Sequence, residues 1–330
     1  MKYNYAIFTS LDGYSAYIYS DLLKLGNVEF VDYNFNGSKF PALNRKLYHL
    51  HNSKINWYVE LPGKGVWNKL IYSKKTTDPA RLCFVFFMSD LRRNKEPLFK
   101  YLKRKYPGCK MVMYFEDIVA SRGPEGKSYL DFSLLDNFFD LAISYDKNDC
   151  EKYGFLYYPT SYTVQDIPDD DSIQESDVFY CGMAKRRYDE ILSNFVFFEN
   201  HKLISDFIVV ASEDQIDKRQ GGIHYRSTYL PYEEYLQHVK RTNCILELMQ
   251  GGATGYTLRV WEALVYGKKL LTNNPAILEA PFYDPNQFRY SKHVSEEDVT
   301  FINQPASIGP RLIEEVSPVN FLNFIERNLK

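Results

Sequence analysis

Polar residues at a spacing that suits phosphate binding lie near position 257 of this 330-residue chain. Thr257 can cap a helix over residues 258–266 with its hydroxyl, and Gly267 can end that helix. Arg259 and Glu262 are three positions apart, so they project from the same side of the predicted helix. A helix start also presents free N–H groups and a partial positive charge, which favour a bound phosphate.

This arrangement predicts a site for a nucleotide sugar. We expect Thr257 and Arg259 to contact the diphosphate and Glu262 to accept hydrogen bonds from the ribose hydroxyls. Glycines before the helix would let the backbone approach the ligand, and two asparagines end the strand after it. The further donor-site residues are Gly255, Tyr256, Asn273 and Asn274, together with Gly251 and Gly252 in the loop. The alternative is an ordinary capped helix with an ion pair between Arg259 and Glu262.

A second basic cluster follows a predicted strand in the segment DVFYCGMAKRRYDEI. Gly182 comes directly after the apolar run, and Lys185, Arg186 and Arg187 precede or begin a helix. Three cations at this place could hold a phosphate or neutralise a departing diphosphate. The alternative is a solvated helix face.

Strands and helices alternate along the whole chain, and this pattern predicts an α/β fold with parallel sheets. Ligands of such folds bind at the carboxyl ends of the strands. A Pro, Asp, Ser and Thr-rich stretch divides the chain into an N-terminal domain over residues 1–160, a linker over 161–176 and a C-terminal domain over 177–330. The amphipathic terminal helix is a candidate for packing back on the N-terminal domain.

The composition limits the classes of partner. The chain has 40 Lys and Arg against 42 Asp and Glu, which argues against general electrostatic binding of nucleic acid. Five cysteines without CxxC pairs indicate a reduced compartment rather than a disulfide framework or a zinc site. The first residues lack a signal-peptide pattern and no run is long enough to span a membrane, so the expected location is the cytoplasm.

Three segments resemble a known family: TGYTLRVWEALVYGKKLLTNN, DVFYCGMAKRRYDEIL and AISYDKNDCEKYGFLYYPTSY. They are similar to segments of bacterial lipopolysaccharide and capsular-polysaccharide glycosyltransferases of the GT-B architecture. The resemblance covers mainly residues 140–275, whereas the first 130 residues match only as a general α/β pattern. Its most specific part comprises Gly255, Thr257, Arg259, Glu262, Ala263, Leu264, Gly267, Lys269, Thr272 and Asn274.

The resemblance implies two Rossmann-like domains facing across a cleft, with the nucleotide-sugar donor in the C-terminal domain. It implies sugar transfer to a surface glycan, such as lipopolysaccharide, O-antigen or capsule. The E-x7-E pair of the large retaining group is missing, because Glu247 lies 15 positions before Glu262, so inversion and retention both stay open. The alternative function is a non-catalytic, two-lobed ligand-binding or scaffold protein of the same fold.

The catalytic base is expected in the N-terminal domain, where the acceptor would bind. Asp12 and Asp117 both follow predicted strands and are the candidates, and Glu116 competes with Asp117 for the same place. Each could equally be a helix cap or a turn residue. No metal is predicted, because the acidic triplet of residues 169–171 lies in the linker without an apolar strand before it, and no cofactor is expected beside the nucleotide-sugar substrate.

A basic amphipathic segment over residues 91–108 suggests peripheral contact with the cytoplasmic face of the inner membrane. Its apolar residues Leu98, Phe99, Tyr101 and Leu102 could rest on an anionic membrane that carries a lipid-linked acceptor. They fit equally well a helix that packs on the sheet and exposes its Lys and Arg side chains to water.

Overall fold

The computed structural model describes residues 1–11, 13–32, 41–53, 62–63, 65–92, 95–119, 130–211, 220–249, 253–305, 311 and 314–329. The chain divides into two compact units, Met1–Thr163 with Glu315–Lys330, and Val164–Glu314. The C-terminal helix therefore belongs to the same unit as the N-terminus. Each unit contains one six-stranded sheet.

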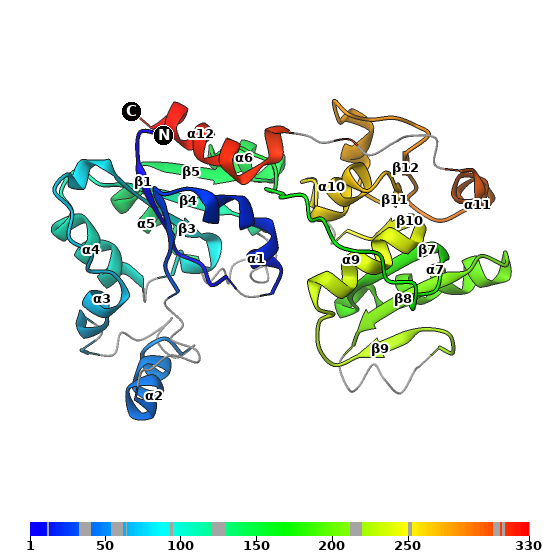
Figure 1. The fold of residues 1–330 in the computed structure, drawn as a ribbon, viewed down its shortest axis with the longest axis horizontal. Coiled ribbons are helices and arrows are strands. Elements are labelled where there is room, and N and C mark those ends of the chain that lie inside the picture. Colours follow the sequence, from blue (N-terminus) through cyan, green and yellow to red (C-terminus); the bar gives the residue numbers. More distant parts are fainter. Residues whose placement is uncertain are drawn as a thin grey trace. The chain divides into compact units, whose positions relative to one another are not determined.

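The sheet of the first unit has the strand order β2-β1-β3-β4-β5-β6 (Figure 1), and all its neighbouring strands are parallel. Its strands are β1 Asn4–Ile7, β2 Val28–Phe30, β3 Leu82–Phe87, β4 Lys110–Phe115, β5 Leu141–Ser144 and β6 Leu156–Tyr157. The central strands β3 and β4 are almost continuously apolar and buried, as expected for parallel strands covered on both faces.

The helices of the first unit are α1 Tyr14–Ile18, α2 Ala42–His51, α3 Gly65–Ile71, α4 Glu96–Lys105, α5 Ser133–Phe138, α6 Lys147–Tyr153 and α12 Pro318–Asn328. Short 3-10 turns cover Ser20–Lys24, Pro79–Arg81 and Met88–Asp90. Helix α1 ends at Ile18, and the 3-10 turn at Ser20–Lys24 follows it after one residue. No helix in the described part of the chain has the length and apolar character that crossing a bilayer requires.

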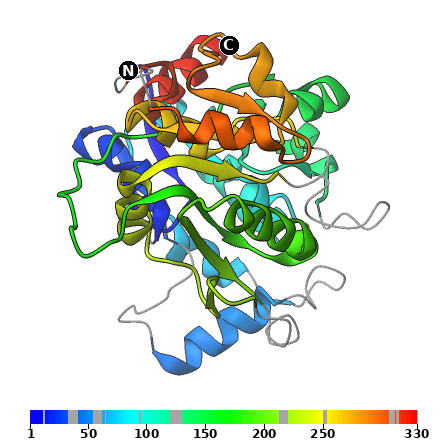
Figure 2. The ribbon, with the colours of Figure 1, turned by 90° about the vertical axis from the view of Figure 1, so that its right-hand side faces the viewer.

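The second unit has the strand order β12-β11-β10-β7-β8-β9, again with parallel neighbours. Its strands are β7 Ser176–Met183, β8 Ser205–Val210, β9 His224–Arg226, β10 Thr242–Glu247, β11 Lys269–Thr272 and β12 Phe288–Tyr290. Its helices are α7 Tyr188–Asn200, α9 Tyr232–Arg241, α10 Leu258–Val265 and α11 Glu296–Asn303, with 3-10 turns at Lys185–Arg187 and Pro275–Glu279. A further turn at Glu314–Val316 leads into α12. Helices α7 and α11 cover one face of the sheet, which faces the viewer in Figure 2. The predicted α/β class with two Rossmann-like domains is confirmed.

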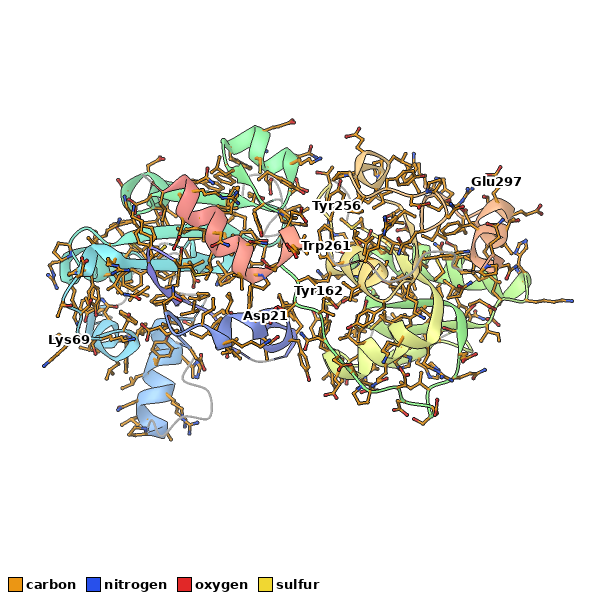
Figure 3. The ribbon with its side chains drawn as sticks, turned by 45° about the horizontal axis from the view of Figure 1, so that its top comes forward. Asp21, Lys69, Tyr162, Tyr256, Trp261 and Glu297 are labelled. Carbon is orange, nitrogen blue, oxygen red and sulfur yellow. The ribbon has the colours of Figure 1, made fainter. Side chains whose placement is uncertain are left out.

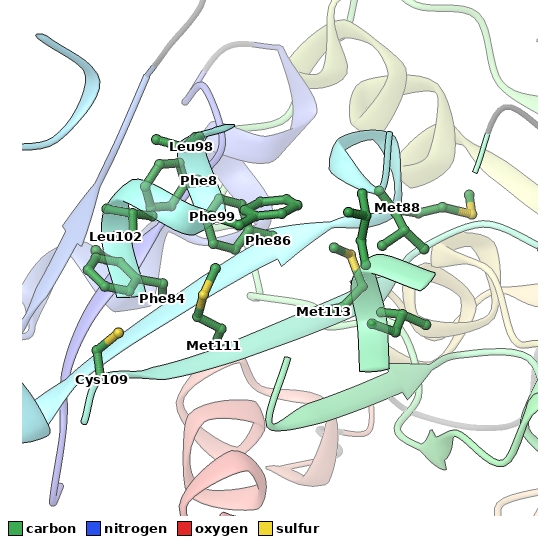
Figure 4. Close-up of a cluster of buried hydrophobic side chains, with 14 of the residues drawn as sticks. Phe8, Phe84, Phe86, Met88, Leu98, Phe99, Leu102, Cys109, Met111 and Met113 are labelled. Carbon is green, nitrogen blue, oxygen red and sulfur yellow. The ribbon is translucent and has the colours of Figure 1, made fainter. Parts of the chain in front are cut away.

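The core of the first unit contains the helix that was considered for membrane contact. Leu98, Phe99, Tyr101 and Leu102 of α4 are at most 8% exposed. Figure 4 shows α4 side chains lying against aromatic side chains of β3. The Phe99 ring centroid lies 5.0 Å from that of Phe86. Of the two interpretations of this segment, the structure therefore supports the helix that packs on the sheet, because the sheet buries these four residues.

Replacing Phe99 tests this core assignment. Phe99→Ala should lower the free energy of unfolding by about 3–5 kcal/mol, because it removes a fully buried ring from a packed site. Urea unfolding measures the change, and Lys100→Ala on the solvent side of α4 is the control, with an expected effect within about 0.5 kcal/mol. Equal losses in the two variants would contradict the assignment.

Candidate functional site

The candidate site lies at the carboxyl edge of the second sheet, where β7, β10 and β11 end as parallel neighbours. Helix α10 begins near this edge. Its N-cap is Thr257, whose hydroxyl accepts a hydrogen bond from the Arg259 backbone N–H at 3.2 Å, as predicted. Gly267, with φ of 62°, follows the end of the helix. The α10 limits predicted from capping residues are therefore correct within one residue.

Arg259 reaches from α10 to the end of β7. Its Nη2 donates a hydrogen bond to the Cys181 carbonyl oxygen. Its Nε is buried and has no hydrogen-bond partner among the described residues. Burial opposes the charge, but nearby Tyr235, Tyr180, Glu247 and Glu262 outweigh this effect and raise the Arg259 pKa. The guanidinium is thus a fixed cation at the strand ends.

Arg187 reaches the same edge from the turn before α7. Its Nη2 donates to the Met183 carbonyl at 3.0 Å, and its Nη1 donates to the Leu248 carbonyl beyond β10. Its Nε is also buried and without a hydrogen-bond partner in the described part of the chain. Within that part, neither Arg187 nor Arg259 forms an ion pair with a carboxylate. Two guanidinium groups therefore lie at this edge without a direct carboxylate ion pair among the described residues.

The other two cations of the basic cluster face water. Lys185 and Arg186 are exposed. Lys185 has φ of 43°, which is unusual for a residue other than glycine and is found where surrounding contacts hold a strained backbone. The structure therefore places Arg187 among the buried strand ends and leaves its two neighbours at the surface.

Tyr180 adds a buried hydroxyl beneath the same strand end. The residue is 1% exposed, and its hydroxyl has no hydrogen-bond partner among the described residues. Burial raises the pKa of Tyr180, and the charges of Arg187 and Arg259 oppose this rise. A Cβ atom at Gly182 would lie 2.9 Å from the Tyr180 hydroxyl and 3.6 Å from Arg259 Nη2, so glycine leaves the space beside both groups open.

Glu247 joins three segments of this edge, although it was not among the predicted site residues. It is 1% exposed at the end of β10 and accepts hydrogen bonds from the hydroxyls of Thr257 and Thr272. The Thr272 bond measures 2.5 Å. One signal was present, namely a carboxylate that ends the otherwise apolar run CILE.

Glu262 points toward α9. It is 1% exposed, and its two carboxylate oxygens accept hydrogen bonds from the hydroxyls of Tyr232 at 2.8 Å and Tyr235 at 2.5 Å. Burial raises its pKa, while these hydrogen bonds and the charge of Arg259 oppose the rise. The ion pair with Arg259 does not form in the described structure. Contact of Glu262 with a ribose stays a prediction.

The two asparagines after β11 brace the loops around the site. Asn273 accepts a hydrogen bond from the Met249 backbone N–H at 2.7 Å and donates to Glu190 at 3.1 Å. Asn274 donates to the Gly255 carbonyl at 3.2 Å. These bonds hold the segments before α10 and after β10 against the end of β11.

Tyr256 packs inward rather than along this edge. Its ring contacts Trp261 of α10 at a centroid distance of 5.8 Å and Phe282 at 5.3 Å, and Figure 3 labels Tyr256 and Trp261. The residue is 4% exposed. Gly251 and Gly252 lie outside the described residues.

The Glu247 network has a measurable role in stability. Glu247→Ala leaves two threonine hydroxyls in a buried place without their acceptor, so the free energy of unfolding should fall by about 1–3 kcal/mol. Glu247→Gln keeps one carbonyl oxygen and should lose less. Urea unfolding compares the parent with the alanine and glutamine variants. An alanine variant as stable as the parent would contradict the stabilising role of Glu247.

The predicted catalytic residues of the first unit lie at the end of β4, as far as the structure describes them. Asp117 is half-buried and accepts a hydrogen bond from the Ile118 N–H at 2.9 Å. Glu116 accepts one from the Met88 N–H at 3.2 Å. Asp12 lies outside the described residues. The catalytic roles of Asp12 and Asp117 stay predictions.

A further carboxylate packs near Asp117. Asp149 of α6 is 8% exposed and accepts a hydrogen bond from the Val119 N–H at 2.8 Å. Burial raises the pKa of Asp149; the Val119 hydrogen bond opposes the rise and the charge of Asp146 adds to it. Sequence analysis missed this residue because α6 is an otherwise ordinary capped helix.

The raised pKa of Asp149 has a defined effect on stability. Above the unfolded-state pKa of about 3.9, the folded protein holds a proton that the unfolded chain has released, so the free energy of unfolding falls as pH rises through this window. Asp149→Asn cannot ionise. Its stability relative to the parent should therefore increase as the pH rises above about 4. Urea unfolding across this range measures the difference, and a constant difference would contradict the assignment.

The acidic triplet of residues 169–171 precedes β7, and two of its side chains pair with residues at the end of α9. Asp169 pairs with Lys240 at 2.5 Å and Asp171 with Arg241 at 3.3 Å, and their side chains are 70% and 94% exposed. Within the described residues, no group of three or more His, Cys, Asp or Glu side chains is arranged to hold a metal ion. Two of the three aspartates therefore form surface ion pairs, and Asp170 accepts hydrogen bonds from Ser172.

No family model and no curated protein matches this chain. Solved structures match nearly its whole length. A UDP-GlcNAc 2-epimerase from Methanocaldococcus jannaschii, solved with UDP-GlcNAc and UDP, has a TM-score of 0.51 and 13% identity over 99% of this chain and 100% of that one. A trehalose-6-phosphate synthase has a TM-score of 0.50 and 9% identity over 99% of this chain and 96% of that one. These similarities show that the chain has the GT-B fold, as predicted.

Proposed function

We propose that this chain is a glycosyltransferase that moves a sugar from a nucleotide-sugar donor to a glycan acceptor. One observation carries the proposal. Arg187 and Arg259 are held at the carboxyl edge of the second sheet by main-chain carbonyls and have no carboxylate ion pair in the described structure. The buried Tyr180 hydroxyl lies in the same region, beside Gly182.

A diphosphate is the ligand that best suits these groups. Guanidinium groups bind phosphate oxygens with paired N–H donors, and partial burial strengthens the attraction. The N-terminus of α10 adds backbone N–H groups at the same edge, beside Thr257. The exposed Lys185 and Arg186 would extend the cationic surface toward an incoming donor. The epimerase with a similar fold was solved with UDP-GlcNAc and UDP, which supports a nucleotide sugar as the donor class.

Glu262 enters this proposal in two ways. It fixes the hydroxyls of Tyr232 and Tyr235 and contributes negative charge near Arg259. The sequence predicts direct contact of Glu262 with the ribose. For this contact, the hydroxyl of the half-buried Tyr232 must give up its hydrogen bond to Glu262 Oε1 when the donor binds. Asn273 and Asn274 hold the loops, and Gly255 provides the carbonyl that Asn274 binds.

The chemistry would proceed by attack of an acceptor hydroxyl on the anomeric carbon while the bond to the diphosphate oxygen breaks. An inverting reaction passes the hydroxyl proton to a carboxylate, for which Asp12 and Asp117 remain the candidates. The two arginines would neutralise the departing diphosphate, so we propose that transfer needs no metal ion. The motif resemblance favours a lipopolysaccharide, O-antigen or capsule acceptor at the cytoplasmic face of the membrane.

Nucleotide binding tests the proposal. Arg259→Ala and Arg187→Ala should each weaken binding of UDP, GDP, ADP or CMP, whichever the parent prefers, by about ten- to a hundredfold, because each removes charge-assisted hydrogen bonds to phosphate. Calorimetric titration measures the affinity. Tyr180→Phe should weaken it less, since it removes one neutral hydroxyl.

Arg241→Ala is the matched control, because Arg241 ends α9 and pairs with Asp171 and Glu175. Nucleotide affinities unchanged in both site variants would overturn the donor site. Transfer is then assayed with nucleotide sugars and glycan acceptors, with and without EDTA. Nucleotide binding without turnover would favour the non-catalytic scaffold, and loss of turnover in EDTA would contradict metal independence.

A further inference from the structure

Helix α2 of the first unit exposes a row of leucines. Leu43, Leu47 and Leu50 are 68%, 42% and 48% exposed. Their spacing of four and three positions places them on one side of the helix, and we call them the leucine stripe. Three large aliphatic side chains in one exposed row are unusual for a helix of ten residues, because apolar faces are normally buried.

Another side of α2 packs against α3, and this packing leaves the leucine stripe facing outward. Tyr48 is 3% exposed and its ring lies 5.5 Å from that of Trp67 in α3. The Trp67 indole N–H donates to His51 Nδ1 at 2.7 Å. These contacts fix the inner face of α2 on α3. Figures 1 and 2 show α2 projecting from the sheet of its unit.

The charged residues of α2 and of the neighbouring α3 are all positive. Lys46 is exposed beside it, and Arg45 is half-buried. On the neighbouring α3, Val66 and Leu70 are 62% and 54% exposed, and Lys69, labelled in Figure 3, is exposed as well. Neither helix contains an Asp or a Glu. On these two helices, exposed aliphatic side chains therefore occur together with cations and without acidic residues.

We propose that the outer faces of α2 and α3 dock on the surface of an anionic lipid bilayer. The leucines would enter the boundary between headgroups and acyl chains, and the Lys and Arg side chains would lie at the lipid phosphates. A second copy of the same surface is disfavoured, because it would bring cations together without an acidic partner. This function is independent of sugar transfer, and it uses side chains that are exposed, whereas the apolar side chains of α4 are buried.

Vesicle flotation of the full chain tests the proposal. The parent should bind vesicles of phosphatidylglycerol and phosphatidylcholine and bind phosphatidylcholine vesicles weakly. The variant Leu43→Ser, Leu47→Ser, Leu50→Ser should lose at least about tenfold in vesicle affinity, because it removes the inserting side chains. Lys46→Gln with Lys69→Gln should lose about fivefold per cation, and only with anionic vesicles.

The control is Ile204→Ser with Leu278→Ser, two residues of the second unit that are 51% and 49% exposed. It should float like the parent. Circular dichroism checks that each variant is folded. If the serine variant does not fold, the lysine variant still tests the proposal. Equal flotation of parent and stripe variants, or no flotation of the parent, would overturn the proposal. A parent dimer that the stripe variant abolishes would overturn it in favour of a second copy.

Discussion

The candidate donor site depends on how the last carbonyl groups of parallel strands are satisfied. Where the sheet ends, these carbonyls lack partners in a neighbouring strand and need a donor. Arg259 and Arg187 supply it at Cys181, Met183 and Leu248. A guanidinium has five N–H donors, so it can satisfy such carbonyls and retain donors for a ligand. The same bonds that complete the sheet thereby fix two positive charges at its edge.

The buried carboxylates Glu247 and Glu262 form no direct ion pair with these arginines in the described structure. Glu247 is bound by two threonine hydroxyls and Glu262 by two tyrosine hydroxyls, so neither forms a direct ion pair with an arginine. A buried carboxylate needs hydrogen bonds to be tolerated, and hydroxyl groups provide them without adding charge. Their longer-range attraction still favours the charged form of Arg259. The site thus combines a rigid frame with two arginines that have no direct carboxylate partner among the described residues.

The two units differ in the chemistry of their strand ends. The second unit places arginines there, whereas the first places the carboxylates Glu116 and Asp117 after β4. Such a division suits a reaction in which one partner is an anionic donor and the other is a hydroxyl that must lose a proton. The cationic, leucine-bearing α2 gives the first unit an additional surface with no role in that chemistry.

Local sequence determined most of the fold. Apolar runs specified β3 and β4, and Thr257 and Gly267 marked the limits of α10, because caps and periodicity act through neighbouring backbone groups. Sequence also brought the Arg259 and Arg187 segments to attention. Tertiary structure alone decided that α4 is buried while α2 exposes its leucines, since an amphipathic pattern does not state what covers its apolar face. It alone joined Glu262 to Tyr232 and Tyr235 and Arg259 to Cys181, because such partners are distant in sequence and meet only when the sheet assembles.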